Sequence, residues 1–561
     1  MTATTVLILT AEMVLLTTAI AIYLGGAFSQ SSRPWAWIAA AGIVLAGAAL
    51  WLWGGERVQG SGFGVQNLSS NAAPDPTEDL KPQGPSPKPQ DLRPKSQASP
   101  ICHDSLAHYG RWLTLALGAV LVLIAWKPLA TGGTPEYVGS LLLTIAGTML
   151  VAVAGDLVLL FVGLELISIP TYILLYMGRR DAARQEAAAK YFFLSVLASA
   201  MFLYGLSFLY GAAGSTNLAE IRAKLAHPEM LPGGFDVLAG IALVLVFAGL
   251  SFRVSAVPFH FYAPDVYQGT THANGALLSV VPKAAGFLAL VRLVLMAMPA
   301  MDWQVGNLPH ELPHAAWRAC QMIGAVAILT MTLGNVVALW QDNLRRLLAY
   351  SSIANAGYML IGVAVGVAAA GAPSRWDGIG ALFFYLCAYA AGTLGVFAAL
   401  THLGRTRQPV EAVDELAGLG RTHPLTAACM AVCLFSLTGL PPAGGLWGKF
   451  FVFGSALSVQ GDADGSLRTW FIALTVIGVL NAAIAAFYYL RIVGVMYFRS
   501  PLAAPRAEGG RGPWLAAVLC SLVVLALGVY PGPLISASNA ASPREETRSK
   551  PPELANAPRS P

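Results

Sequence analysis

Long apolar runs recur along most of the chain and decide what it can fold into. Each run is long enough to cross the roughly 30 Å hydrocarbon core of a bilayer as a helix. The chain is 56% hydrophobic and 11% charged, whereas a soluble domain has about 25% charged residues. The sequence therefore predicts an all-α polytopic membrane protein with about fourteen transmembrane helices. The predicted spans are 5–27, 34–54, 112–130, 137–154, 157–178, 188–212, 236–257, 273–298, 317–340, 345–370, 377–402, 424–456, 468–492 and 513–535.

Two proline-rich breaks interrupt these spans at comparable places. One is VPFHFYAP at 257–264 and the other is LPPAGGLWGKF at 440–450. They lie five spans apart, so the two broken helices would cross the membrane in opposite directions. This pattern is typical of two inverted five-helix repeats, here helices 4–8 and 9–13, each with a proline-broken helix. Prolines are also common in membrane helices without any repeat.

The remaining segments are predicted to flank these two repeats. Residues 58–104 and 536–561 are rich in Pro, Ser and charge and are expected to be a disordered insert and a disordered tail. No cleavable signal peptide is expected, because residues 1–27 carry Glu12 and lack a basic start. The predicted parts are 1–57 with helices 1 and 2, 105–134 with helix 3, 135–298 with the first repeat, 317–498 with the second repeat, and 513–535 with helix 14.

Lys and Arg residues are more frequent in the short loops after odd-numbered spans than in those after even-numbered spans. Basic loops stay on the cytoplasmic side, so both termini are predicted to face outside. The net charge of +5 is spread over these loops and gives no indication of nucleic-acid binding.

Five charged residues lie inside apolar runs, where each costs on the order of 3 kcal/mol by insertion scales. They are Glu165, Lys190, Arg253, Lys283 and Lys449. A chain that carries several such charges is predicted to move charge across the membrane. The alternative for the lysines is that they extend to the membrane surface; that alternative is stronger for Lys190, near its helix start, than for Lys283, about ten residues into its helix.

The histidines include one candidate proton carrier and one motif that only resembles a zinc site. His260 lies between Pro258 and Pro264 in the first break and is either a proton carrier or a hydrogen-bonded structural histidine. The run from His310 to His314 spells HExxH, but Pro313 lies within the turn that would have to place both histidines on one face. No zinc site is therefore expected there, and the six cysteines form no CxxC pair.

Several ordered motifs resemble those of the antiporter-like membrane subunits of respiratory complex I, and the PDVYQG run with a lysine at 449 resembles the N-type subunit. The resemblance covers roughly residues 105–535. The motifs are GLELISIPTYILLY (163–176), AAAKYFFLSVLASA (187–200), VPFHFYAPDVYQG (257–269), NLRRLLAYSSIANAGYML (343–360) and LTGLPPAGGLWGKF (437–450).

The resemblance implies roles for the matching positions. Glu165 resembles a countercharge to a basic residue two spans later, and Lys190 a modulator or linker. Lys283 resembles the central-axis lysine, Lys449 the terminal lysine, and His260 a bridging histidine.

Position 253 departs from the family pattern, which has lysine there. Because a guanidinium is not deprotonated in proteins, Arg253 is predicted to be a fixed charge beside Glu165, with His260 and Lys283 carrying protons.

The resemblance implies a proton-translocating subunit of NADH:quinone oxidoreductase in the bacterial plasma (inner) membrane, without a redox centre of its own. NAD, FMN, iron–sulfur clusters and quinone would belong to partner subunits, with which this chain would assemble in the bilayer. The alternatives are a subunit of a secondary cation/proton antiporter, a subunit of a related membrane-bound hydrogenase, and a structural subunit that pumps nothing.

Overall fold

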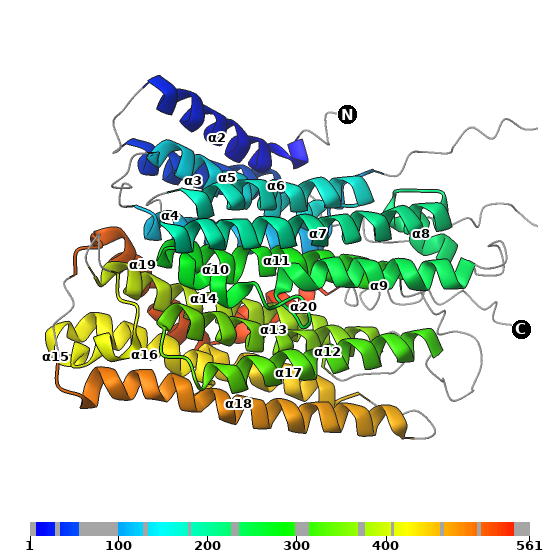
Figure 1. The fold of residues 1–561 in the computed structure, drawn as a ribbon. Coiled ribbons are helices and arrows are strands. Elements are labelled where there is room, and N and C mark those ends of the chain that lie inside the picture. Colours follow the sequence, from blue (N-terminus) through cyan, green and yellow to red (C-terminus); the bar gives the residue numbers. More distant parts are fainter. Residues whose placement is uncertain are drawn as a thin grey trace, which may run out of the picture.

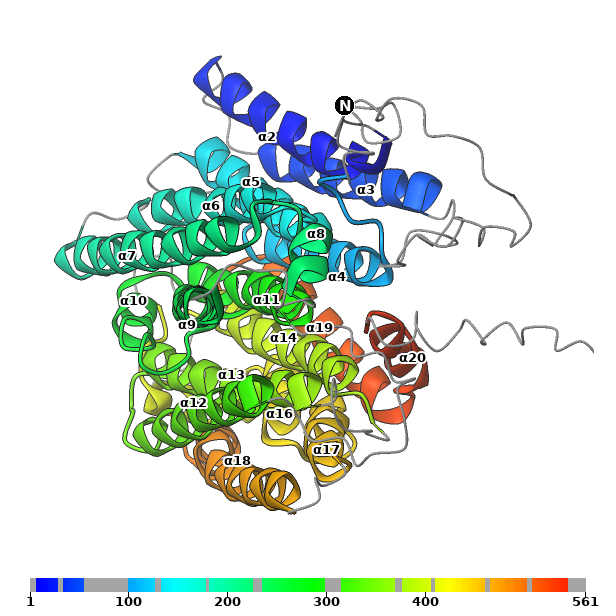
Figure 2. The ribbon, with the colours of Figure 1, turned by 90° about the vertical axis from the view of Figure 1, so that its right-hand side faces the viewer.

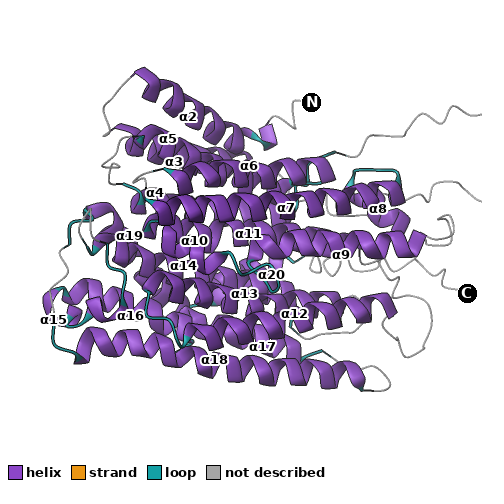
Figure 3. Cartoon of the chain, in the orientation of Figure 1, coloured by secondary structure: helices purple, strands orange, loops and turns teal. Residues whose placement is uncertain are grey.

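The protein is described by a computed structural model. It describes residues 7–28, 34–54, 99–126, 133–177, 181–225, 235–297, 314–368, 376–404, 409–459, 465–501 and 507–542. In this part of the chain the helices are joined by loops and turns, and there is no β-strand, only isolated β-bridges (Figure 3). The predicted all-α fold is confirmed.

The long helices run side by side in one bundle (Figure 1). Those before residue 300 are α2 (Thr10–Phe28), α3 (Pro34–Gly54), α4 (Ser105–Ile124), α5 (Thr134–Val153), α6 (Leu157–Tyr176), α7 (Ala182–Ala213), α9 (Phe235–Val254) and α11 (His272–Ala297). Those after it are α12 (His314–Ala338), α13 (Leu344–Ala368), α14 (Gly378–His402), α16 (Pro424–Thr438), α17 (Gly444–Leu457), α18 (Ser466–Phe498) and α19 (Arg511–Val529). The short ones are α8 (Leu218–Leu225), α10 (Ala263–Gly269), η2 (Val413–Leu416), α15 (Leu419–Thr422) and α20 (Gly532–Ala540).

Among the described residues, 12 helices are long and apolar enough to cross a membrane. The two other predicted spans, 236–257 and 424–456, coincide with α9 and with the pair α16 and α17. The total of about fourteen spans therefore stays a prediction.

Helices α11, α13 and α14 form the centre of the bundle (Figure 2). All of the most apolar stretch of α11 and of α13 is buried inside the protein, and 89% of that of α14 is. In α7 and α18 only 33% of that stretch is buried, so these two helices lie at the outside of the bundle. The charged residues of α11, Lys283 and Arg292, are thus surrounded by protein.

Both predicted proline breaks are present. Helix α9 ends at Val254, and a turn through Pro258 leads to the short helix α10. Helix α16 ends at Thr438, and α17 begins at Gly444 after the Pro441–Pro442 pair. Backbone groups left unpaired by a break must find partners inside a membrane; the N–H of Val257, for example, donates to Thr330 Oγ1 of α12 at 3.0 Å. The inverted repeat itself stays a prediction.

Three predicted boundaries were wrong. Helix α4 begins at Ser105 rather than 112, because Asp104 caps it by accepting from the Ala107 N–H at 2.8 Å. The predicted disordered insert ends too late, since Ile101 bridges to Ala154. The predicted disordered tail begins too early, since α20 extends to Ala540. The rest of both segments, 58–98 and 543–561, lies outside the described residues, as do His310 and Glu311.

Candidate functional site

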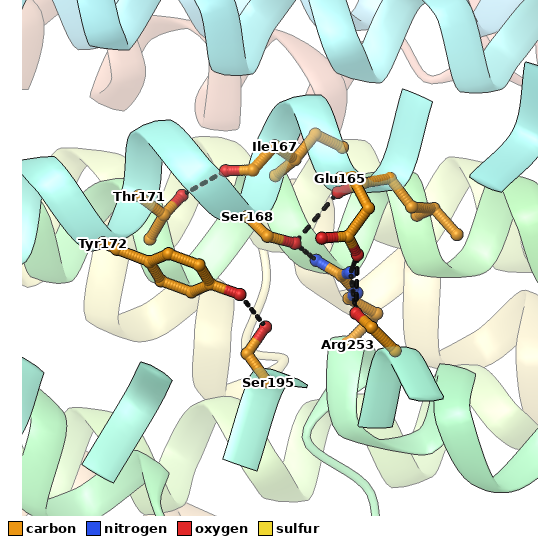
Figure 4. A network of polar contacts seen from close by, with 9 residues as sticks. Glu165, Ile167, Ser168, Thr171, Tyr172, Ser195 and Arg253 are labelled. Atoms are coloured by element: carbon orange, nitrogen blue, oxygen red, sulfur yellow. Dashed lines mark hydrogen bonds and ion pairs between the residues drawn. The ribbon is translucent and has the colours of Figure 1, made fainter. Parts of the chain in front are cut away.

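Glu165 and Arg253 form an ion pair between α6 and α9 (Figure 4). Arg253 Nη2 lies 3.0 Å from Glu165 Oε1. The side chain of Arg253 is 4% exposed and that of Glu165 is 24% exposed, so the arginine is enclosed while the carboxylate retains access to the surface of the bundle. The predicted pairing of these two residues is confirmed.

Two serines complete the surroundings of this pair. Ser199 of α7 donates to Glu165 Oε1 at 2.5 Å and accepts from Arg253 Nη2 at 3.2 Å. Ser168 of α6 accepts from Arg253 Nη1. The planar guanidinium therefore contacts two helices at once, a geometry that its fork of fixed donors makes possible. Arg253 also lies in the last turn of α9, where the helix dipole favours a cation.

Lys190 lies at the rim of the bundle rather than in its interior. Its side chain is 39% exposed, and Nζ lies 2.6 Å from Asp265 of α10 and 2.7 Å from Glu186. Asp265 also pairs with Arg346 of α13 at 2.7 Å. Burial raises the pKa of Asp265, but hydrogen bonds from Lys190 and Arg346 outweigh it and bring that pKa below its usual range. Asp265 thus links Lys190 of α7 to Arg346 in the second half of the chain.

His260 lies in the turn between α9 and α10 and is partly buried. Its Nδ1 is buried and has no hydrogen-bond partner within the described residues. No hydrogen bond joins it to Lys283 in the described part of the chain. Its predicted bridging role is therefore untested and stays a proposal.

Lys283 is fully enclosed at the centre of the bundle, with 0% exposure. Its Nζ donates to Ser352 Oγ of α13 at 2.6 Å, and no carboxylate pairs with it among the described residues. The alternative that this lysine extends to the membrane surface is wrong. An ammonium in such surroundings has one neutral oxygen to compensate for the loss of water, which makes its charged state costly.

Lys449 is also enclosed, with 5% exposure, but has different partners. Its Nζ donates to the carbonyl oxygens of Leu437 at 2.9 Å and Thr438 at 2.8 Å, at the end of α16. Gly439, at φ +91°, leaves space for the lysine, since a Cβ there would lie 3.1 Å from Lys449 Cδ. The negative end of the α16 dipole favours a cation at this position. The break between α16 and α17 therefore provides the hydrogen-bond acceptors and the space that hold the Lys449 side chain.

Helix α9 packs closely against α11 next to Arg253. A Cβ at Gly286 would lie 3.1 Å from Arg253 Cβ, and Gly286 is one helical turn from Lys283. The side chains themselves point to different partners, since Arg253 contacts Glu165 and Lys283 contacts Ser352.

Sequence analysis missed two buried ion pairs outside this group. Arg292 of α11 contacts both carboxylate oxygens of Asp104, with Nη2 to Oδ1 at 2.9 Å and Nη1 to Oδ2 at 3.0 Å. Arg111 of α4 lies 2.7 Å from Glu12 of α2. All four residues are less than 10% exposed. Their separation in sequence gave no local signal of pairing.

Comparison with known proteins relates the chain to one family. The family model for the transmembrane region of "NADH:quinone oxidoreductase/Mrp antiporter" matches residues 154–484. "NADH-quinone oxidoreductase subunit N 1" of Solibacter usitatus is 38% identical over 435 residues, which is 76% of this chain and 82% of that protein.

Two solved structures share the fold. A chain of respiratory complex I from Thermus thermophilus with bound aureothin has a TM-score of 0.69 and 28% identity, covering 95% of this chain and 100% of that one. A chain of the Mrp complex from Dietzia sp. has a TM-score of 0.71 and 20% identity, covering 96% of this chain and 97% of that one. The fold alone does not distinguish these two kinds of complex; the sequence identity favours the first.

Proposed function

This chain belongs to the family of NADH:quinone oxidoreductase and Mrp antiporter membrane subunits, and from that premise we propose that it translocates protons as subunit N of an NADH–quinone oxidoreductase. It is a multi-pass integral membrane protein whose partners are the other membrane subunits of complex I. We place it in the bacterial inner membrane with both termini outside. NADH, flavin, iron–sulfur and quinone chemistry would take place in those partners.

Enclosure of Lys283 and Lys449 by helices is the observation that carries this proposal. A lysine can release its proton when it is removed from water, whereas an arginine cannot. Two such lysines therefore provide two positions at which a proton can be held and passed on. Moving one charge across the membrane costs about 2.3 kcal/mol per 100 mV, and a change in the pairing of a buried charge supplies energy of that size.

Arg253 would act by its charge alone. It stays protonated at either position of the Glu165 pair, so its distance from Glu165 sets how much positive charge α11 experiences next to Lys283. We propose that opening this pair favours proton release at Lys283 and that closing it favours uptake. Lys190 would connect α7 to α13 through Asp265 of the break, and His260 remains a candidate carrier from the break.

The antiporter function is the second candidate, because the family includes Mrp antiporters and the Dietzia complex has the same fold. Relatives 36–40% identical to this chain are named subunit N, which favours the first candidate.

Isolation of the tagged chain from its native membrane tests the proposal. The expected result is a complex that oxidises NADH, reduces quinone and acidifies one side of a vesicle when reconstituted. A complex that contains only cation-transport subunits and exchanges Na⁺ for protons without NADH would contradict it.

A further inference from the structure

One side of α13 contacts both Lys283 and Lys449. Ser352, Asn355 and Tyr358 are spaced three residues apart, so each is a neighbour of the next on the helix surface. Ser352 accepts the hydrogen bond from Lys283 at 2.6 Å, and the Tyr358 ring lies 5.3 Å from Lys449 Nζ. From Ser352 to Tyr358 the helix rises about 9 Å. The same side of α13 therefore joins the two proton-holding positions.

Two tyrosines of α14 pair with this side. The Tyr389 hydroxyl donates to Ser352 Oγ at 2.7 Å, and the Tyr385 hydroxyl donates to Asn355 Oδ1 at 2.5 Å. The Tyr385 ring in turn packs edge-on against Tyr358, with centroids 6.5 Å apart. We call these five residues, Ser352, Asn355, Tyr358, Tyr385 and Tyr389, the polar ladder; each of them is at most 2% exposed.

Asn355 lies at the middle of the polar ladder, and both the oxygen and the nitrogen of its side-chain amide have hydrogen-bond partners. Its Oδ1 accepts from Tyr385, while its Nδ2 donates to the Ser351 carbonyl at 2.7 Å and to the Tyr489 hydroxyl of α18 at 3.3 Å. A carbonyl oxygen can only accept, so the contact with Ser351 determines which end of the amide is nitrogen.

The amide differs from its neighbours in what it can do with a proton. Serine and tyrosine hydroxyls both donate and accept, so they can receive a proton on one side and release one on the other. An amide nitrogen only donates and an amide oxygen only accepts. Among the described residues, no hydrogen bond joins the group of Lys283, Ser352 and Tyr389 to the group of Asn355, Tyr385 and Tyr489. Asn355 lies on α13 between Ser352 and Tyr358, the residues that contact Lys283 and Lys449.

We propose that Asn355 is a positioning residue that keeps Lys283 and Lys449 separated in this state, and that a proton passes between them only when the Tyr385–Asn355 hydrogen bond opens and water enters. The inference rests on the proposed function and adds to it the place where the path is controlled. Water between Tyr385 and Tyr489 would replace the amide with a group that both donates and accepts.

Replacement of the amide by a smaller hydroxyl tests this inference. Asn355→Ser leaves a polar space next to two tyrosine hydroxyls, enough to admit a water molecule. The whole complex is reconstituted into vesicles, and proton entry is followed with an internal pH dye under a potassium diffusion potential, without NADH. Asn355→Ser is expected to raise this passive proton conductance severalfold per assembled complex.

Asn274 of α11 provides a matched control. It is equally buried, at 2% exposed, and its amide has the same kinds of partner: it accepts from Tyr137 at 2.7 Å and donates to the Leu174 carbonyl at 2.8 Å and to Thr270 Oγ1 at 2.9 Å. It does not lie between the lysines. Asn274→Ser is expected to leave the passive conductance at the wild-type value, whatever it does to stability.

A second variant guards against misfolding of the first. Tyr385→Phe removes the hydroxyl that donates a hydrogen bond to Asn355 Oδ1. Like Asn355→Ser, it is expected to raise the passive proton conductance. Wild-type conductance in both Asn355→Ser and Tyr385→Phe would overturn the inference. A leak that persists in the double variant Asn355→Ser/Lys283→Ala would overturn it too, because the leak would then not run through Lys283.

Failure of the inference can be separated from failure of the proposed function. Lys283→Ala alone measures whether pumping needs the central lysine. Loss of pumping in Lys283→Ala together with a wild-type conductance in both Asn355→Ser and Tyr385→Phe would reject only the role of Asn355. Unchanged pumping in Lys283→Ala would reject the proposed function.

Discussion

Arg253 contacts Glu165 through one guanidinium nitrogen, with 3.0 Å from Nη2 to Oε1, and its other terminal nitrogen, Nη1, donates a hydrogen bond to Ser168. The pair therefore joins α9 to α6 at the end of a broken helix. In the second half of the chain, Lys449 has backbone carbonyls instead of a carboxylate as partners. The first break thus stabilises its positive charge with a carboxylate side chain, and the second does so with backbone carbonyls. A side-chain movement of Glu165 or Arg253 is enough to change the first arrangement.

The charge at position 253 should matter more than the shape of its side chain. Arg253→Ala leaves Glu165 without its counter-ion and removes the positive charge next to α11, so protons translocated per NADH oxidised are expected to fall severalfold. Arg253→Lys retains a cation and is expected to keep most of the pumping. The ratio is measured in vesicles that contain the assembled complex. An Arg253→Ala complex with the wild-type ratio would remove the electrostatic role.

Asp104 is expected to be a sensitive position for stability. Asp104→Asn leaves the buried guanidinium of Arg292 without a counter-ion, a loss of about 3–5 kcal/mol. Thermal unfolding of the detergent-solubilised complex measures it. Asp414→Asn is the control, because its pair with Arg499 is about 60% exposed on both sides and such pairs contribute about 1 kcal/mol or less. Equal shifts in the two variants would contradict the account.

The Lys190–Asp265–Arg346 contact should give a pH-dependent contribution to stability. Its partners hold the pKa of Asp265 below the usual range, so the contribution is present above about pH 4, the unfolded value, and is lost as pH falls through the lowered folded pKa. Between about pH 5 and about pH 8 this contribution should not change with pH, because that range lies above the usual pKa of an aspartate. The difference in melting temperature between wild type and Asp265→Asn is expected to be flat over that range and to shrink below it; a difference that grows on acidification would be the wrong sign.

Sequence alone predicted the helical membrane fold, both breaks, the Glu165–Arg253 pair and the depth of Lys283. Each of these depends on the chemistry of single residues: a charge far from either end of an apolar run has to be covered by protein, and clustered prolines disfavour a continuous helix. Single prolines do not suffice, since Pro170 and Pro282 lie inside α6 and α11.

Lys190 shows where such reasoning stops. Depth along a helix follows from counting residues, but the partner of Lys190 is Asp265, far away in sequence and placed by the turn after α9. The start of α4 was hidden for a similar reason, since Arg111 looks too polar for a membrane helix until Glu12 is placed beside it. Asn355 gave no signal at all, because a single amide in a helix has no distinguishing pattern before its three partners are known.

Proton pumping by the assembled complex with Lys283→Ala tests the central claim most directly. The complex is reconstituted into sealed vesicles, and proton uptake and NADH oxidation are recorded together, so that slower electron transfer does not count as lost pumping. The account predicts fewer protons translocated per NADH than in the wild-type complex. A wild-type ratio from a complex shown to contain the variant chain would contradict it.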